Sequence, residues 1–185
     1  NGRIDKDGDE DVFHFNGKSG DEVVAEVQAR RLLSPMDSLL QLMDASGHVV
    51  AWNDDYERKE GDLRPDMGAI THHADSYLRT KLPADGVYYV RLTDAQRQGG
   101  EAFAYRLRLG APRPDFSLRM TPSTLNLRGG IATPITVHVL RSDGFNGPIT
   151  LSLKDAPAGF KLQGAVIPAG CDHIRMTVTP PSEGI

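Results

Sequence analysis

Three oxygen-bearing side chains follow an apolar run in the segment HVVAWNDDYE, which extends from residue 48 to residue 57. Asn53, Asp54 and Asp55 stand where a buried strand is expected to end. Carboxylate and amide oxygens are the ligands that calcium prefers, and the ion takes about six to eight of them. The segment therefore predicts one part of a calcium site.

Two more aspartates stand at the starts of expected strands, in the related sequences DSLL at 37–40 and DSYL at 75–78. A hairpin through ASG at 45–47 and a long connection after residue 53 would make these strands neighbours. Two unpaired charges about 4 Å apart then repel by roughly 4 kcal/mol at an effective dielectric constant near 20, and a divalent cation would turn that repulsion into binding. We therefore expect one calcium ion to be bound by Asp37, Asn53, Asp54, Asp55 and Asp75.

A simpler interpretation is open for each of these residues. Aspartate and serine at strand ends commonly form Asx turns and cap backbone groups without binding a metal. The acidic segment DKDGDED at 5–11 is similar to the start of an EF-hand, but it has Glu10 where the motif needs glycine and Asn16 where it needs glutamate. This segment is either an acidic lead-in or the source of one more ligand to the same site.

The sequence contains none of the common catalytic motifs. G-x-S-x-G, H-E-x-x-H and phosphate-binding glycine loops are all absent from it. Paired acids can hydrolyse glycosides, so a hydrolase that uses the clustered carboxylates is the less favoured alternative. The single cysteine, Cys171, excludes an internal disulfide and a cysteine-based zinc cluster. The histidines are expected on polar faces or in a loop, without catalytic roles: His14, His72, His73, His138 and His173.

The 185 residues, of which 39% are hydrophobic, suffice for one large or two small cores. The net charge of −4 argues against binding to nucleic acid, whose phosphates require a basic patch. No apolar run approaches the length that spans a bilayer. The chain begins within an acidic segment, and we expect it to be a fragment of a longer protein.

Apolar residues alternate with polar ones along most of the chain, which is typical of half-buried antiparallel strands. Turn sequences separate these runs, and Pro35 interrupts the one segment with a helical pattern. The pattern predicts an all-β chain of two β-sandwiches, with the expected inward-facing residues being Val23, Ala25, Val27, Ala29, Tyr88, Val90, Leu92, Phe103, Tyr105, Leu107, Leu109, Ile135, Val137, Val139, Ile149, Leu151, Leu153, Ile174, Met176 and Val178.

A linker is expected at GAPRPDF, residues 110–116, where two prolines and a glycine separate strand patterns. It would divide the chain into a first domain at 1–111 and a second at 112–185, the latter expected to lack its last strand. The segment between Asn53 and Ala74 has little strand character, and loops of this length are usually functional or disordered. A carbohydrate- or protein-binding module would use the 56–74 loop and Trp52, although Trp52 follows Val49, Val50 and Ala51 and is expected in the core.

The succession GDEDVFHF, SPMDSLLQLMDASGHVVAWNDD and DSYLRTKLPADGVYYVRLTD resembles the bacterial pre-peptidase C-terminal domain family over residues 1–110. The resemblance implies a jelly-roll-like sandwich attached to a secreted bacterial enzyme or surface protein. Such domains are similar to the collagen-binding domains of clostridial collagenases, some of which hold calcium near an acidic linker. The resemblance thus supports the same five residues as calcium ligands.

The segment PDFSLRMTPSTLNLRGG with GFNGPITLSLKDAPAGFKL resembles a bacterial immunoglobulin-like domain, a class that usually serves in spacing or adhesion. We therefore expect a non-catalytic accessory module of a larger secreted, periplasmic or cell-surface bacterial protein, stabilised by calcium. Its expected partners are other domains of the parent protein and, for a binding module, an extracellular protein or polysaccharide.

Overall fold

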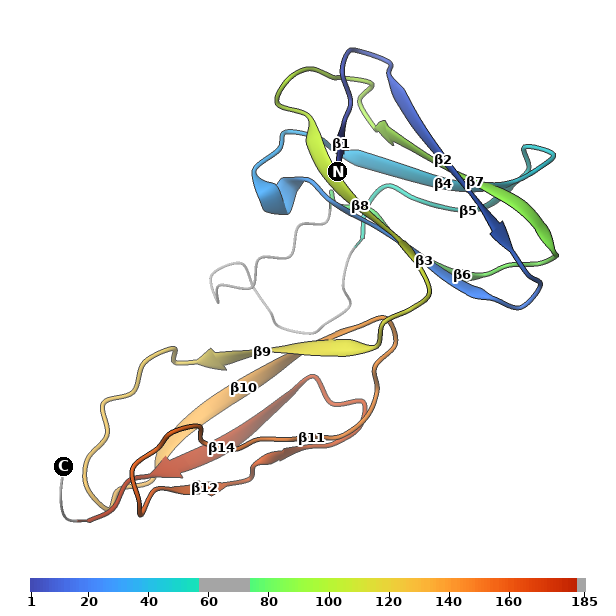
Figure 1. The fold of residues 1–185 in the computed structure, drawn as a ribbon. Coiled ribbons are helices and arrows are strands. Elements are labelled where there is room, and N and C mark those ends of the chain that lie inside the picture. The colour runs from blue at the N-terminus through green and yellow to red at the C-terminus, as the bar shows by residue number, and fades with distance from the viewer. Residues whose placement is uncertain (57–73, 183–185) are drawn as a thin grey trace. The chain divides into compact units, whose positions relative to one another are not determined.

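The computed structural model describes residues 1–56 and 74–182, which consist almost entirely of strands and turns (Figure 1). These residues divide into two compact units, 1–56 with 74–112 and 113–182. The predicted all-β fold of two sandwiches is confirmed. The expected binding loop at 56–74 lies, apart from its first and last residues, outside the described part of the chain, as do His72 and His73.

The first unit is a sandwich of two four-stranded antiparallel sheets. One sheet has the order β1-β8-β3-β6 and the other the order β2-β7-β4-β5. The strands of the first sheet are β1 (Gly2–Arg3), β8 (Ala104–Gly110), β3 (Glu22–Gln28) and β6 (Tyr77–Lys81). Those of the second are β2 (Glu10–Gly17), β7 (Gly86–Asp94), β4 (Ser38–Asp44) and β5 (Val49–Asn53).

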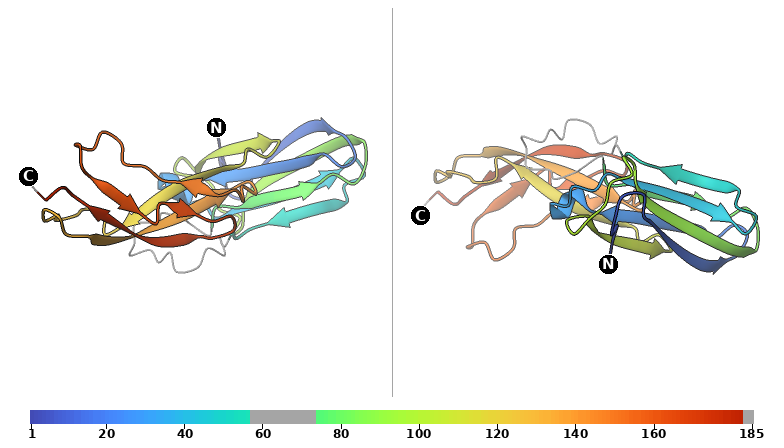
Figure 2. Two further views of the ribbon diagram at one scale, coloured as in Figure 1. Left: turned by 90° about the horizontal axis from the view of Figure 1, so that it is seen from below. Right: turned by 90° about the horizontal axis from the view of Figure 1, so that it is seen from above.

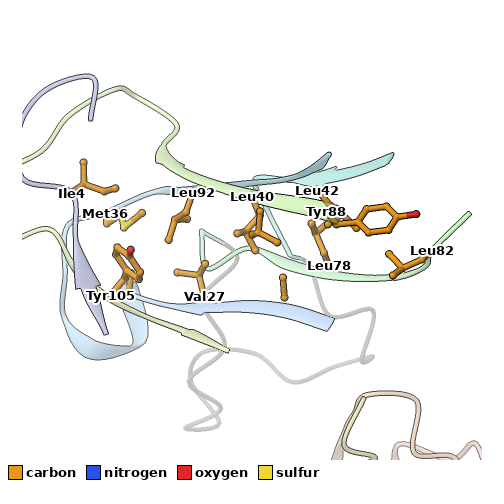
Figure 3. Packing of buried hydrophobic residues seen from close by; sticks show 13 residues of the cluster. Ile4, Val27, Met36, Leu40, Leu42, Leu78, Leu82, Tyr88, Leu92 and Tyr105 are labelled. Atoms are coloured by element: carbon orange, nitrogen blue, oxygen red, sulfur yellow. The ribbon is translucent and has the colours of Figure 1, made fainter. Parts of the chain in front are cut away.

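The core of the first unit lies between these two sheets (Figure 3). Tyr88, Val90 and Leu92 of β7 are each at most 2% exposed, as the alternation predicts. They pack with Leu40 and Leu42 of β4 and with inward-facing residues of β3 and β8. Every apolar position predicted for this core contributes to it, because antiparallel strands that have one covered face alternate regularly.

The one helix of the described residues is a single 3-10 turn, η1 (Arg30–Leu32), between β3 and β4. Pro35 does prevent a longer helix, and Leu33 ends the turn in the left-handed conformation with φ 68°. No helix in residues 1–56 or 74–182 could cross a membrane.

The second unit has a four-stranded sheet of order β12-β14-β10-β9 and a two-stranded sheet of β11 and β13. Figure 2 shows the longer strands side by side in yellow to red. Their bounds are β9 (Asp115–Thr121), β10 (Thr133–Ser142), β11 (Ile149–Thr150), β12 (Lys161–Gln163), β13 (Val166–Ile167) and β14 (His173–Thr179). The alternating residues of β10 and β14 form its core, which includes Val139 at 0% exposure. An immunoglobulin-like fold for this unit stays a prediction.

Tyr105 of β8 joins the N-terminal segment to the first core. A side chain on Gly2, its partner in β1, would collide with the Tyr105 ring, so only glycine fits there. The Tyr105 hydroxyl donates a short hydrogen bond to the Asp11 carboxylate on β2 of the opposite sheet. Burial and the bond to Asp11 both raise the pKa of Tyr105 far above its usual value.

We predict that Tyr105 makes the first unit sensitive to alkali. A raised pKa in the folded state gives a stabilisation that is complete below the unfolded-state value of about 10 and is lost as pH rises further. Denaturant titrations of the wild type and Tyr105→Phe from about pH 8 to about pH 11 should show the wild type losing unfolding free energy more steeply. Parallel curves for the two proteins would contradict this role.

Candidate functional site at the strand ends

The ends of three strands meet at one end of the first unit, as expected, but not within one sheet. Asn53 ends β5, whereas Ser38 and Tyr77 begin β4 and β6. β4 and β5 form the predicted hairpin, but β6 pairs with β3 in the opposite sheet. The expected hairpin pairing of β5 with β6 is therefore wrong, because β6 belongs to the opposite sheet, although the ends of the two strands are in contact through Asn53 and Tyr77. The site bridges the two layers of the sandwich.

A pair of buried serines forms the junction between the layers. The Ser38 and Ser76 hydroxyl oxygens are 2.8 Å apart, and neither residue has measurable exposure. The Ser76 amide donates to Ser38 Oγ at 2.8 Å, and Ser76 Oγ donates a short bond to the Ser38 carbonyl. The serines of the two related sequences DSLL and DSYL are thus bonded to each other.

The Asp75 carboxylate is buried and accepts four hydrogen bonds. It receives the backbone amides of Ala29, Arg30 and Arg31 at 2.9, 2.7 and 3.2 Å, and Arg31 Nε at 2.7 Å. These three amides open the 3-10 turn, where backbone N–H groups lack partners within the helix. Asp75 therefore fixes the turn after β3 to the start of β6, and its charge is balanced by a guanidinium.

The arginines continue this network across the sheet. Arg31 also contacts Glu26 of β3, with Nη2 at 3.1 Å from Oε1, and Arg108 of β8 reaches the other Glu26 oxygen at 2.8 Å. The Glu26 side chain is largely buried. The contacts therefore run in the order Asp75, Arg31, Glu26 and Arg108, so that carboxylates and guanidiniums alternate from the start of β6 through η1 and β3 to β8.

The other predicted ligands make separate local contacts. Asn53 Oδ1 accepts the Tyr77 amide at 2.9 Å, and its Nδ2 donates to the Asp55 carbonyl at 2.8 Å. Asp54 Oδ1 accepts the Asp55 amide at 3.0 Å. Asp37 donates its amide to Asp94 Oδ2 at 2.8 Å. Asn53 thus bonds β5 to β6, and these contacts are those of turns and strand ends.

A second buried carboxylate, Asp94, closes the turn after β7. Besides the Asp37 amide, it accepts the amides of Gln96 and Gln98 on Oδ1 at 3.1 and 3.0 Å. In the N-terminal acidic segment, Asp9 accepts the Asp5 amide and Asp7 accepts the Gly99 amide. Carboxylates in this unit therefore organise loops by accepting backbone N–H groups.

The predicted calcium ligands do not form one cluster of carboxylates. Within residues 1–56 and 74–182, no three His, Cys, Asp or Glu side chains are placed to hold a metal ion together. Asp75 fits a metal least well, because its oxygens are already engaged by four donors. The calcium site stays a prediction, and Asp37, Asn53, Asp54 and Asp55 are its remaining candidates.

An exposed face of the β2-β7-β4-β5 sheet is the second candidate. Trp52 is 60% exposed, so its expected place in the core is wrong. A β-bulge between β4 and β5 pairs Trp52 with Gln41 but Val49 with Met43, which turns both β5 residues away from the core. The register brings eight side chains to this side of the sheet, which we call the aromatic face: Val12, His14, Gln41, Met43, Val49, Trp52, Tyr89 and Arg91.

A cavity of about 440 Å³ adjoins the aromatic face at Arg91 and is also lined by Glu10, Thr93 and Arg97. Arg91 Nη1 lies 3.4 Å from Glu10 Oε2. Its Nε is buried and has no hydrogen-bond partner within the described residues. Tyr89 and His14 lie beside each other on this face, with ring centroids 6.3 Å apart. The face therefore combines exposed rings with an unsatisfied donor.

Comparison with known proteins identifies the first unit. Residues 9–94 match the family model of the bacterial pre-peptidase C-terminal domain. This part of the chain is such a domain. A probable subtilase-type serine protease from Deinococcus radiodurans is 38% identical over 86 residues, which cover 46% of this chain and 10% of that protein. No solved structure matches the chain.

The pre-peptidase C-terminal domain contains functional-site features that the sequence analysis missed. Arginines neutralise Asp75 and Glu26, and the only sequence signal for this is the segment ARRLL, which follows a predicted strand directly. The repeated Asp-Ser pair does indicate that the two segments lie close together in the fold. The sequence predicts that its aspartates act together, whereas the serines are the residues in contact.

We predict that Asp75→Asn lowers the unfolding free energy of the domain by about 3 kcal/mol, because a buried charged acceptor of four bonds is lost and Arg31 keeps only Glu26 of its two carboxylate partners. Asp55→Asn is the control and should change it by less than about 0.5 kcal/mol when both variants are measured in chelator-treated, calcium-free buffer. Urea denaturation followed by circular dichroism measures both. Equal effects of the two substitutions would contradict the anchoring role of Asp75.

Proposed function

We propose that the chain is a non-catalytic accessory module of a larger secreted bacterial protein, and that its first unit adsorbs the parent protein to an extracellular polysaccharide through the aromatic face. The exposure of Trp52 on the aromatic face is the observation that carries this proposal. The match to the pre-peptidase C-terminal family and the partial match to a probable protease support the accessory role. The second unit would then serve as a spacer or a further adhesion unit.

The chemistry of the aromatic face favours a polysaccharide over a protein partner. Indole and phenol rings offer flat apolar surfaces that cover the C–H faces of sugar rings, and each ring keeps a polar tip for a hydroxyl group. One strand separates Trp52 from Tyr89, and the two residues are also two positions apart in register, so they lie about 12 Å apart on the sheet, which suits a chain of several sugar rings. Gln41 lies between Trp52 and Arg91 in one row across the sheet, and both Gln41 and Arg91 provide donors for hydroxyl groups.

Binding to insoluble polysaccharide tests this proposal. Cellulose and chitin are incubated with the wild type, Trp52→Ala, Tyr89→Ala and the control Leu33→Ala, which removes an exposed leucine on another part of the unit. We predict that the wild type and the control bind alike, whereas Trp52→Ala binds about tenfold less tightly because it loses roughly 1.4 kcal/mol of ring contact.

Gelatin is included in the same assay as a protein ligand. Trp52-dependent binding to gelatin and to neither polysaccharide would replace the polysaccharide proposal with a protein partner. Binding to none of the three would leave the spacing role alone.

We also propose that calcium stabilises the strand ends of the first unit through Asp37, Asn53, Asp54 and Asp55, with loop carbonyl oxygens completing the shell. Asp54 and Asp55 support this proposal, because they are adjacent at the end of β5 and none of their carboxylate contacts in the described residues involves a positive charge. Calcium bound to the folded state alone would raise stability by mass action.

Calorimetric titration of chelator-treated protein with calcium, together with thermal melts, tests this second proposal. We predict a measurable heat and a higher melting temperature in millimolar calcium, both reduced in Asp54→Asn. Asp75→Asn should lower the melting temperature equally with and without calcium. Absence of heat and of any shift would mean that these aspartates only cap backbone groups.

A further inference from the structure

Two histidines lie directly opposite each other in the second unit. His138 of β10 and His173 of β14 are partners in the antiparallel register, and their ring centroids are 5.8 Å apart. The rings are tilted by 30° to each other. Directly opposed side chains of antiparallel strands start from Cβ atoms only about 5 Å apart, so both imidazoles can reach one point in space.

His173 is held by its neighbour in the sequence. Its Nδ1 lies 2.6 Å from Asp172 Oδ1, and the Asp172 carbonyl accepts the Val139 amide at 2.6 Å next to His138. A carboxylate that accepts the Nδ1 proton fixes the tautomer in which Nε2 presents a lone pair. This second-layer carboxylate is the usual support of a histidine that binds a metal.

His138 is not the exposed residue that its alternation with apolar residues predicts. It is only 6% exposed. Within residues 1–56 and 74–182 its ring forms no hydrogen bond, but its nitrogens are not among the fully buried atoms that lack a partner, so they stay reachable from solvent. A largely buried imidazole that lies close to a second imidazole, with its nitrogens still reachable from solvent, has a lone pair available for a ligand.

We propose that His138 and His173 form a two-imidazole site for a borderline divalent metal ion such as Zn²⁺ or Cu²⁺. Two imidazole nitrogens at 2.0–2.1 Å from one tetrahedral ion place their ring centroids about 5 Å apart, within about 1 Å of the observed separation. Imidazole suits these metals, whereas calcium and magnesium prefer oxygen. The described residues supply no third side-chain ligand, so water would complete the shell.

Two arginine side chains near the histidines are expected to weaken metal binding without preventing it. Arg119 is the partner of His138 on β9, and Arg175 follows His173 by two residues on β14. Arg119 Nη1 donates to the Leu118 carbonyl at 2.9 Å, which gives the guanidinium another partner. Because like charges repel, removing the Arg119 charge should strengthen binding of a metal ion. Simple packing of two histidines predicts no such effect.

Metal titration of the whole 185-residue chain tests the site. All variants carry His72→Ala and His73→Ala, which removes the other adjacent histidines of the sequence. Zn²⁺ binding is followed by calorimetry, and Cu²⁺ binding by electron paramagnetic resonance, which reports the number of coordinated nitrogens. We expect one ion per chain and a Cu²⁺ spectrum with two equivalent imidazole nitrogens.

Variants distinguish a metal-binding site from two histidines that only pack against each other. His138→Ala and His173→Ala should each abolish the two-nitrogen spectrum, Asp172→Asn should weaken Zn²⁺ binding about tenfold, and Arg119→Gln should tighten it. His14→Ala and His48→Ala are controls that should change nothing. Absence of saturable binding, or binding that persists in His138→Ala with an unchanged spectrum, would overturn the proposal.

Discussion

The buried carboxylate of Asp75 is the interaction on which the first unit depends. It accepts every N–H that the 3-10 turn offers at its start and pairs with Arg31. Without it, three amides would be buried or half-buried without partners, at a cost of about 1–3 kcal/mol each. The turn carries the chain from β3 in one sheet to β4 in the other, so this carboxylate sets how the two layers are connected.

The serine pair next to Asp75 has the complementary role. Ser38 belongs to one sheet, and Ser76 directly precedes β6 in the other. Their mutual bonds close the sandwich at this end with small polar groups where the apolar core ends. The sheet that contains β4 then presents its second face to solvent, and that face carries Trp52, Tyr89 and Arg91. Ser38 thus lies in the same sheet as the proposed binding surface, whereas Glu26 and Arg108 of the anchoring network lie in the opposite sheet.

The sequence predicted the class of the fold and most of its core, since alternation along a strand follows directly from the pleat. It could not predict that β6 crosses to the opposite sheet, because the same alternation is satisfied in either layer. Trp52 was misplaced for a local reason: the bulge opposite Leu42 and Met43 breaks the period of two, so Val49 and Trp52 face the same way. At the strand ends the sequence predicts a metal ion as the partner of Asp75, but Arg31, a residue of the turn after β3, neutralises this carboxylate. The calcium site formed by the other strand-end residues stays a prediction.

Native-state amide hydrogen exchange at Ala29, Arg30 and Arg31 tests the central role of Asp75 most directly. These amides lie in a short turn, which would exchange rapidly by local opening if the turn were held only by its own bonds. Because all three donate to one buried carboxylate, the account predicts that Ala29 and Arg30 exchange only through unfolding of the whole unit, with the same free energy as Val90 in the core. Exchange at a much lower free energy than that of Val90 would contradict it.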